Sequence, residues 1–413
     1  MVSALARTPV IAAEPRAVER VAYVIEYPLA QNDLDRYGIG YLRAHGRTVS
    51  VIDVGEITQP YVAQDRRHYS SFSDLALYAV TRRSDLASVA PVLANADLIV
   101  AIFGVGGLTR QNLAVFRAIS RSGKPYLMLF TNAFPGWNKY RGETGVFWKR
   151  TAHVLARAFE IDWVNTTIAR LAPARLGVRQ ADFVVRGGRK SALPHALIGP
   201  KTRVVHAHTM DYERFRALPR ADAKSRFAVF IDEYIPFEID HALLGTKPEM
   251  PPEAYHAALS ALFDRIEREL GLEVAIAANP RADYSDKPYA FGGREPIKHA
   301  TARLVNESAL VIAHRSTAIG LAVMARKPLI IAATQEIYRH SAHRPVFDAI
   351  CAALGKPITW FDTADRADLT RVLDVDQQAY DRYMTDFVKL PGAPDQPYWQ
   401  IVLDGVETAL APR

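Results

Sequence analysis

Residues 309–332 read ALVIAHRSTAIGLAVMARKPLIIA, and this stretch sets the expected fold class. The apolar run Ala309–Ala313 predicts a buried strand, Thr317–Arg326 predicts an amphipathic helix, and Leu329–Ala332 predicts a second buried strand. Two parallel strands need a long crossover, usually a helix, whereas antiparallel strands can be joined by a tight turn. The stretch is therefore typical of one strand–helix–strand unit of a parallel sheet.

The same alternation extends through the second half of the chain. Three further strands are predicted, at Phe227–Asp232, Glu273–Ala278 and Ile358–Phe361. Helices are predicted at Pro252–Leu270, His299–Asn306 and Val346–Leu354, with more helix at Gln377–Leu390 and Pro397–Leu410.

The first half repeats this pattern. Its predicted strands are Arg20–Glu26, Thr48–Val54, Ala96–Gly104, Pro125–Thr131, Ala181–Arg186 and Thr202–His206. Its predicted helices are Asn32–His45, Ser84–Ala94 and Arg110–Ser122.

The halves meet at a polar, Pro-containing stretch, Leu218–Ser225. Alternating strands and helices in each half predict an α/β protein with two Rossmann-like domains that face a cleft. We expect the first domain at 20–220 and the second at 226–375. The C-terminal helices at 376–413 are expected to pack back on the first domain.

Composition narrows the function classes. The chain has 413 residues and one cysteine, Cys351, which excludes an intramolecular disulfide and a cysteine-based zinc site. No apolar run reaches the roughly 18–20 residues that span a bilayer, and Met1–Arg20 lacks the apolar core of a signal peptide. We therefore expect a cytoplasmic protein, and contact with the inner face of the cytoplasmic membrane is the alternative left open.

The charge balance favours anionic ligands. The formal net charge is +7, which suits nucleotides, phospholipid surfaces or nucleic acid. The basic residues are spread along the chain without a Lys/Arg block or a nucleic-acid motif. A nucleic-acid partner is therefore not expected.

In open α/β sheets, ligands bind beyond the carboxyl ends of the strands. Asp232 and Glu233 follow a predicted strand of the second half. A carboxylate at this place can act as a general base on an acceptor hydroxyl, and the alternative is a helix cap or a structural ion pair. These two residues are the predicted catalytic pair.

The next strands offer groups suited to a donor phosphate. Asn279, Pro280 and Arg281 follow one strand, and Arg suits bidentate phosphate recognition. Arg294 adjoins a glycine pair where a ligand could approach the backbone closely. The alternative for each is an ordinary turn with a surface Arg.

The strongest motif is His314, Arg315, Ser316 and Thr317, between a buried strand and a helix. Hydroxyls and free backbone N–H groups at a helix N-terminus can bind a phosphate. The alternative is simple N-capping, which is compatible with anion binding. We expect all four residues to bind the donor.

The first half supplies the predicted acceptor contacts Glu26, Gly104, Gly106 and Arg189. The Gly104 loop lacks the full Gly-x-Gly-x-x-Gly spacing because residue 109 is Thr109, so NAD is not expected. His206 and His208 end another strand and point the same way. No acidic third ligand is close in sequence, so no metal and no cofactor are expected.

The order of Asp232-Glu233, Asn279-Pro280 and Ser316-Thr317 resembles bacterial sialyltransferases and related transferases of 3-deoxy-2-ulosonic acids. The likeness covers mainly residues 226–335. It implies the glycosyltransferase B fold, a CMP-linked donor and a general base at Asp232. Two positions depart from the family pattern: Asn279 replaces a His, and Tyr234 replaces the Gly that follows the acidic pair. Asn279 cannot supply a proton to the leaving phosphate, a role that Arg281 or His314 could take over.

The resemblance implies inverting transfer of an acidic sugar from CMP to a glycan or glycolipid of a surface polysaccharide such as capsule or O-antigen. One alternative is a UDP- or GDP-sugar donor, with Glu233 or Glu336 at the donor. Another is a sugar-nucleotide epimerase on the same fold. The last is a non-enzymatic binding component of a polysaccharide assembly complex.

Overall fold

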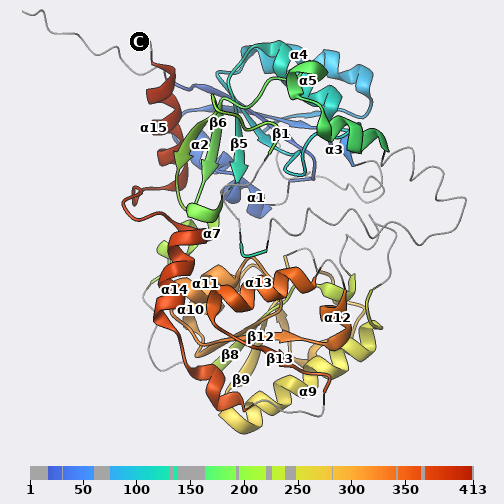
Figure 1. Cartoon of the computed structure of the whole chain (residues 1–413), viewed down its shortest axis with the longest axis vertical. Coiled ribbons are helices and arrows are strands. Elements are labelled where there is room, and N and C mark those ends of the chain that lie inside the picture. Colours follow the sequence, from blue (N-terminus) through green and yellow to red (C-terminus); the bar gives the residue numbers. More distant parts are fainter. Residues whose placement is uncertain are drawn as a thin grey trace, which may run out of the picture.

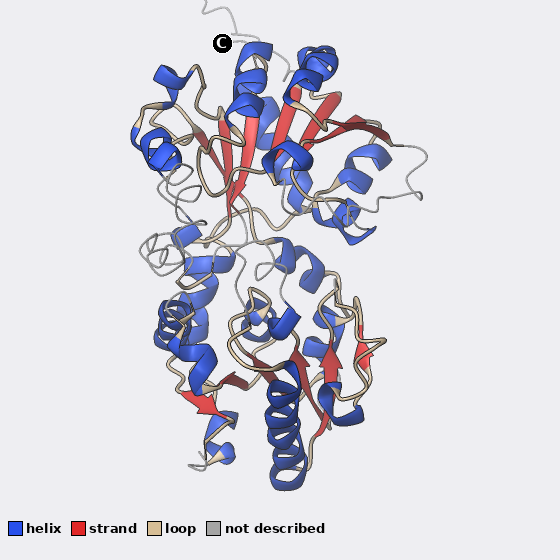
Figure 2. Ribbon diagram, turned by 90° about the vertical axis from the view of Figure 1, so that its right-hand side faces the viewer, coloured by secondary structure: helices blue, strands red, loops and turns tan. Residues whose placement is uncertain are grey.

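The computed structural model describes residues 17–29, 31–59, 75–130, 134–136, 163–191, 195–219, 226–237, 248–280, 282–340, 343–363 and 368–411. Within them the chain forms two parallel sheets, each flanked by helices (Figures 1 and 2). This is the predicted pair of Rossmann-like domains.

The first sheet has seven strands in the order β3-β2-β1-β4-β5-β6-β7, and every pairing is parallel. Its strands are β1 (Arg20–Ile25), β2 (Thr48–Asp53), β3 (Ala76–Ala79), β4 (Leu98–Ile102), β5 (Tyr126–Phe130), β6 (Phe183–Arg186) and β7 (Arg203–His206). Its helices are α1 (Gln31–Arg36), α2 (Ile39–Ala44), α3 (Gly55–Thr58), α4 (Leu86–Asn95), α5 (Leu113–Ser122) and a helix at 163–170.

The second sheet has six strands in the order β10-β9-β8-β11-β12-β13, again all parallel. They are β8 (Phe227–Ile231), β9 (Glu273–Ala277), β10 (Pro296–Ile297), β11 (Leu310–Ala313), β12 (Leu329–Ala333) and β13 (Ile358–Trp360). The remaining helices are α7 (Met210–Arg216), α9 (Pro252–Leu270), α10 (Thr301–Glu307), α11 (Ile319–Met324), α12 (Gln335–Arg339), α13 (Arg344–Leu354), α14 (Gln377–Tyr383) and α15 (Tyr398–Leu410).

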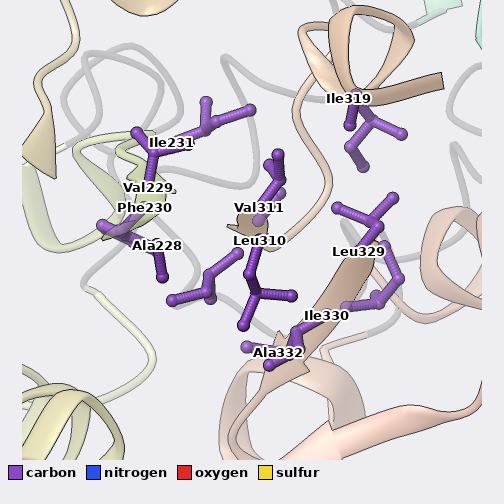
Figure 3. Close-up of a cluster of buried hydrophobic side chains, with 14 of the residues drawn as sticks. Ala228, Val229, Phe230, Ile231, Leu310, Val311, Ile319, Leu329, Ile330 and Ala332 are labelled. Atoms are coloured by element: carbon purple, nitrogen blue, oxygen red, sulfur yellow. The ribbon is translucent and has the colours of Figure 1, made fainter. Parts of the chain in front are cut away.

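The core of the second domain explains why residues 309–332 read as they do. Every residue of β11 and β12 is buried, because helices cover both faces of a parallel sheet. Val229 of β8, Val311 of β11 and Ile330 of β12 lie together in this core (Figure 3). The strand segments therefore carry continuous apolar runs rather than alternating ones.

The predicted helix Asn32–His45 is wrong, because Gly38 divides it into α1 and α2. Gly38 adopts a left-handed backbone with φ 66. A Cβ there would lie 1.9 Å from the ring of Trp399 on α15. The break thus lets the indole of a distant helix pack against the backbone.

The end of the chain contributes to both domains. α14 packs against α13 of the second domain, whereas Tyr398, Trp399 and Val402 of α15 are buried in a core cluster of the first. α7 lies within the range assigned to the first domain, yet it packs on α10 and α11 of the second. Figure 1 shows α7 and α14 on the same side of the molecule, with α15 above them.

The carboxyl ends of the strands in both sheets point toward the junction between the two domains. Thr209, just after β7, and Thr317, after β11, line the same small pocket. In addition, a Cβ on Gly136 would lie 2.9 Å from the Cα of Val346 in α13, so first-domain backbone touches that helix. Polar groups that follow the strands of the second sheet therefore lie on its first-domain side.

Candidate functional site

Asp232 leaves β8 at this edge and is 5% exposed. Its Oδ1 accepts a hydrogen bond from the backbone N–H of Tyr234 at 2.8 Å. Its Oδ2 accepts from the backbone N–H of Asn279 at 3.0 Å and from the Tyr284 hydroxyl at 2.9 Å. The carboxylate thereby joins the exits of β8 and β9.

The electrostatics of Asp232 follow from this environment. Burial raises the pKa of its carboxyl, and the three hydrogen bonds act in the opposite direction. Burial and the nearby Asp232 carboxylate both raise the pKa of Tyr284. Tyr284 therefore stays protonated and donates, so Asp232 serves as the acceptor at the centre of the loop network.

Glu233 links the same loop to the next strand exit. Its Oε1 accepts a hydrogen bond from the backbone N–H of Arg315 at 2.7 Å. Glu233 is more exposed than Asp232. Of the predicted catalytic pair, it is thus the carboxylate better placed to meet a ligand.

Tyr234 stands where the resembled transferases have a glycine, and its backbone adopts a conformation that favours glycine. Its φ is 60, in the left-handed region that L residues rarely adopt. Its ring packs against Tyr284 and Phe237, and its hydroxyl donates to the Asp283 carbonyl at 3.1 Å. Strained backbone of this kind costs roughly 1–3 kcal/mol and concentrates at functional sites.

The predicted donor residues are only partly brought together. Asn279 contributes its backbone N–H to Asp232, and Pro280 is exposed beside it. Ser316 Oγ accepts from the Ala318 backbone N–H at 3.1 Å. Thr317 is exposed toward the junction pocket. Arg281 lies outside the described residues.

His314 is a correction to the predicted donor set. It is 0% exposed. Its Nδ1 donates to the Ala332 carbonyl at 2.6 Å, so its Nε2 accepts from the Tyr255 hydroxyl at 2.9 Å. Burial lowers its pKa to about 4. The ring is a neutral core group and cannot reach a donor from this position.

Arg294 is a second correction. Its guanidinium pairs with Glu267 at 2.7 Å and Asp264 at 2.8 Å, and it lies over the ring of Phe263. Glu267 also accepts from the backbone N–H of Val274, at the start of β9. Arg294 therefore lies toward the amino end of the strand, away from the carboxyl edge.

The predicted acceptor residues occupy separate places in the first domain. Glu26 follows β1 and Gly106 is exposed. Gly104 is buried, and its carbonyl accepts from His195 Nε2 at 3.0 Å. Arg189 forms an ion pair with Asp386 at 2.6 Å. Asp386 belongs to the C-terminal segment that runs from the second domain back to the first, so this ion pair connects the two domains.

His206 and His208 do not form a metal pair. His206 is exposed at the end of β7, whereas His208 is fully buried and its Nε2 donates to the Gln396 carbonyl at 3.0 Å. Within the described residues, the group that could hold a metal ion is instead Glu249, His340 and His343. Sequence reasoning missed it, although the His-x-x-His spacing of 340–343 was visible.

None of the described helices is long and apolar enough to cross a bilayer.

No known family model matches the sequence, and no curated protein is similar to it. Solved structures do match. The H548A variant of the wall teichoic acid polymerase TagF aligns with 95% of this chain and 90% of its own, at 10% identity and a TM-score of 0.53. TagF H444N soaked with CDPG aligns over the same shares, at 11% identity and 0.52. The glycosyltransferase SnogD from Streptomyces nogalater aligns with 96% of this chain and 100% of its own, at 16% identity and a TM-score of 0.46. The two TagF likenesses show the fold: two Rossmann-like domains in the GT-B arrangement.

Proposed function

We propose that the protein is a glycosyltransferase that moves a sugar from a nucleotide-activated donor to a glycan or glycolipid acceptor. The observation that carries the proposal is the polar network at the carboxyl edge of the second sheet. There Asp232 and Glu233 connect the exits of β8, β9 and β11 through Asn279, Tyr284 and Arg315. A site with its groups fixed before the substrate binds reduces the reorganisation needed in the transition state.

Within this proposal the two carboxylates have different roles. Glu233 is the general base that accepts the proton of the acceptor hydroxyl as that oxygen attacks the anomeric carbon. Its Oε1 is held by Arg315, which fixes its direction. Asp232 is a positioning residue, because its three hydrogen bonds hold the loop that carries Glu233.

The finer proposal concerns the donor. The leaving group is CMP and the transferred sugar is an acidic ulosonic acid, with inversion at the anomeric carbon. The Asp-Glu, Asn-Pro and Ser-Thr order supports it, together with the net charge of +7. Ser316 and Thr317 are the donor contacts in this scheme, since both lie on the first-domain side of β11 and neither is fully buried.

The experiment is a calorimetric panel of CMP, CDP, CDPG, UMP, UDP, GDP and NAD on the full chain. Wild type is compared with Ser316→Ala/Thr317→Ala and with Ser88→Ala, which removes an exposed hydroxyl of α4 in the first domain. We expect selective CMP binding that the double substitution weakens by at least about tenfold, a loss of roughly 1.4 kcal/mol. Ser88→Ala should bind as wild type does.

Other outcomes replace the proposal in defined ways. Selective binding of UDP or GDP keeps the transferase and changes the donor. Conversion of a sugar nucleotide to its epimer without an acceptor indicates an epimerase. Binding of none of the nucleotides, with and without a glycan acceptor, contradicts the transferase and favours a binding component of an assembly complex.

A further inference from the structure

Three ligand-type side chains of the second domain that the proposed transfer does not use lie close together. Glu249 precedes α9, His340 follows α12 and His343 precedes α13. One oxygen or nitrogen of each lies within 4.8 Å of the others. Glu249 Oε1 is 3.7 Å from His343 Nδ1 and 4.0 Å from His340 Nδ1.

The two imidazoles lie beside each other. The backbone N–H of His343 donates to the His340 carbonyl at 3.0 Å, and the ring centroids are 4.5 Å apart. The Nδ1 atoms of both rings are the atoms nearest to the Glu249 carboxylate.

Burial makes the cluster more than a surface ion pair. The side chains of Glu249 and His343 are 9% and 6% exposed. The Nδ1 atom of His340 is itself buried and has no hydrogen-bond partner among the described residues. A buried polar atom without a partner costs free energy. A cation among the three groups would give the Nδ1 atom of His340 a partner.

We infer that Glu249, His340 and His343 bind a divalent transition-metal ion, with zinc as the best match. Imidazole nitrogen and carboxylate oxygen are normal zinc ligands at about 2.0–2.2 Å. Tetrahedral geometry at those lengths places ligand atoms about 3.4 Å apart, so Glu249 Oε1 must approach the two Nδ1 atoms, now at 3.7 Å and 4.0 Å, by roughly 0.3–0.6 Å. Three protein ligands leave a fourth position for water or an anionic oxygen.

The site would link segments that are distant in sequence. The ion joins Glu249, shortly before α9, to His340 after α12 and His343 before α13. First-domain backbone at Gly136 touches the first turn of α13, at Val346. Metal binding therefore stabilises the second domain beside its junction with the first. This inference does not depend on the identity of the sugar donor.

The test uses the full chain after treatment with a chelator. Zn²⁺ is titrated by calorimetry, and Co²⁺ is titrated by visible absorbance, which reports the ligand geometry directly. We expect one equivalent to bind, a rise in Tm with Zn²⁺, and the absorbance of tetrahedral Co²⁺. His340→Ala, His343→Ala and Glu249→Gln should each weaken binding by roughly 100-fold, about 2.7 kcal/mol.

The matched control is His206→Ala, which removes an exposed histidine of β7 and should bind metal as wild type does. If His343→Ala fails to fold, His340→Ala decides, because its side chain is 38% exposed and tolerates truncation better. The inference is overturned if the wild type binds no Zn²⁺, or if binding is unchanged in the folded His340→Ala variant. In that case Glu249 and the two histidines interact only with one another, without a metal ion.

Discussion

The carboxyl ends of the two sheets are built differently, although both sheets are parallel and similar in size. At the end of β2 in the first domain, Asp53 accepts from the backbone N–H of Gly55, two residues away. At the end of β8 in the second domain, Asp232 and Glu233 reach Asn279, Tyr284 and Arg315. Both aspartates are buried.

The two sites differ in how far apart in sequence their hydrogen-bond partners lie. The hydrogen bond that the Gly55 N–H donates to Asp53 is local, because it joins residues that are neighbours in sequence. The hydrogen bonds of Asp232 and Glu233 join three strand exits, so the loops of the second sheet hold one another in place. Preorganisation of this kind is what a catalytic site requires. The same fold can thus provide a scaffold in one domain and a prepared site in the other.

The largest expected effect separates the two carboxylates of the prepared site. Glu233→Gln keeps an oxygen for the Arg315 N–H but removes the base. We expect turnover to fall by about 10²–10⁴-fold with little change in Tm. Activity is measured with the donor identified by the nucleotide panel, and thermal unfolding serves as the control. Full activity in Glu233→Gln, with loss in a folded Asp232→Asn, would return the role of base to Asp232.

Acid should destabilise the second domain through His314. Its pKa is about 4 in the folded chain, against 6.5 for an ordinary histidine. Between these values the unfolded state binds more protons than the folded state, so the contribution of His314 to stability is lost as the pH drops from 6.5 to 4. Above pH 6.5 this contribution is constant. The contribution is about 3 kcal/mol.

Urea unfolding at several pH values measures this loss of stability. His314→Gln, which cannot titrate, should show a shallower dependence on pH than wild type. NMR of the His314 ring at pH 5 provides a check that does not rely on a variant. An imidazolium signal in the folded protein would show that the buried neutral ring is wrong.

The sequence predicted the scaffold better than the site. Interior strands such as Leu310–Ala313 are apolar because they are covered on both faces, and that pattern is visible without a structure. The edge strand β3 was missed because all four of its residues are exposed and carry no such pattern. The break of the α1–α2 helix was missed because its cause, Trp399, lies at the other end of the chain.

The same reasoning applies to the site residues. Strand-end position predicted Asp232 and Glu233 as the catalytic pair, but their hydrogen-bond partners come from loops distant in sequence. Its position after a strand also predicted His314 as a donor contact. The structure buries its side chain completely, and the sequence does not reveal that burial. Glu249 is far from His340 in sequence, so only the fold brings them together.

Truncating the two buried aspartates should sharpen the comparison between the sheets. Asp232→Ala leaves three donors without their acceptor, and we expect a loss of about 3 kcal/mol in the free energy of unfolding. Asp53→Ala removes the local hydrogen bond from the Gly55 N–H and should cost about 1 kcal/mol. Urea unfolding of both variants gives the difference. Equal losses would mean that the Asp232 network is no more than a local turn.

The smallest effect concerns Tyr234, where the backbone has φ 60. At an ordinary position, glycine is less stable than alanine because it gains more freedom on unfolding. At Tyr234 the order should reverse, because alanine retains the left-handed strain, roughly 1–2 kcal/mol, that glycine relieves. Both substitutions remove the same ring contacts with Tyr284 and Phe237, so their difference isolates the backbone.

We therefore expect Tyr234→Gly to be more stable than Tyr234→Ala by about 1 kcal/mol, measured by urea unfolding. The matched pair at Ala87, an exposed position inside α4, should show the usual order, with Ala87→Gly less stable than wild type by roughly 1 kcal/mol. If glycine is the less stable residue at both positions, the loop after β8 is not strained. The second sheet would then hold Asp232 and Glu233 without the backbone cost that distinguishes it from the first.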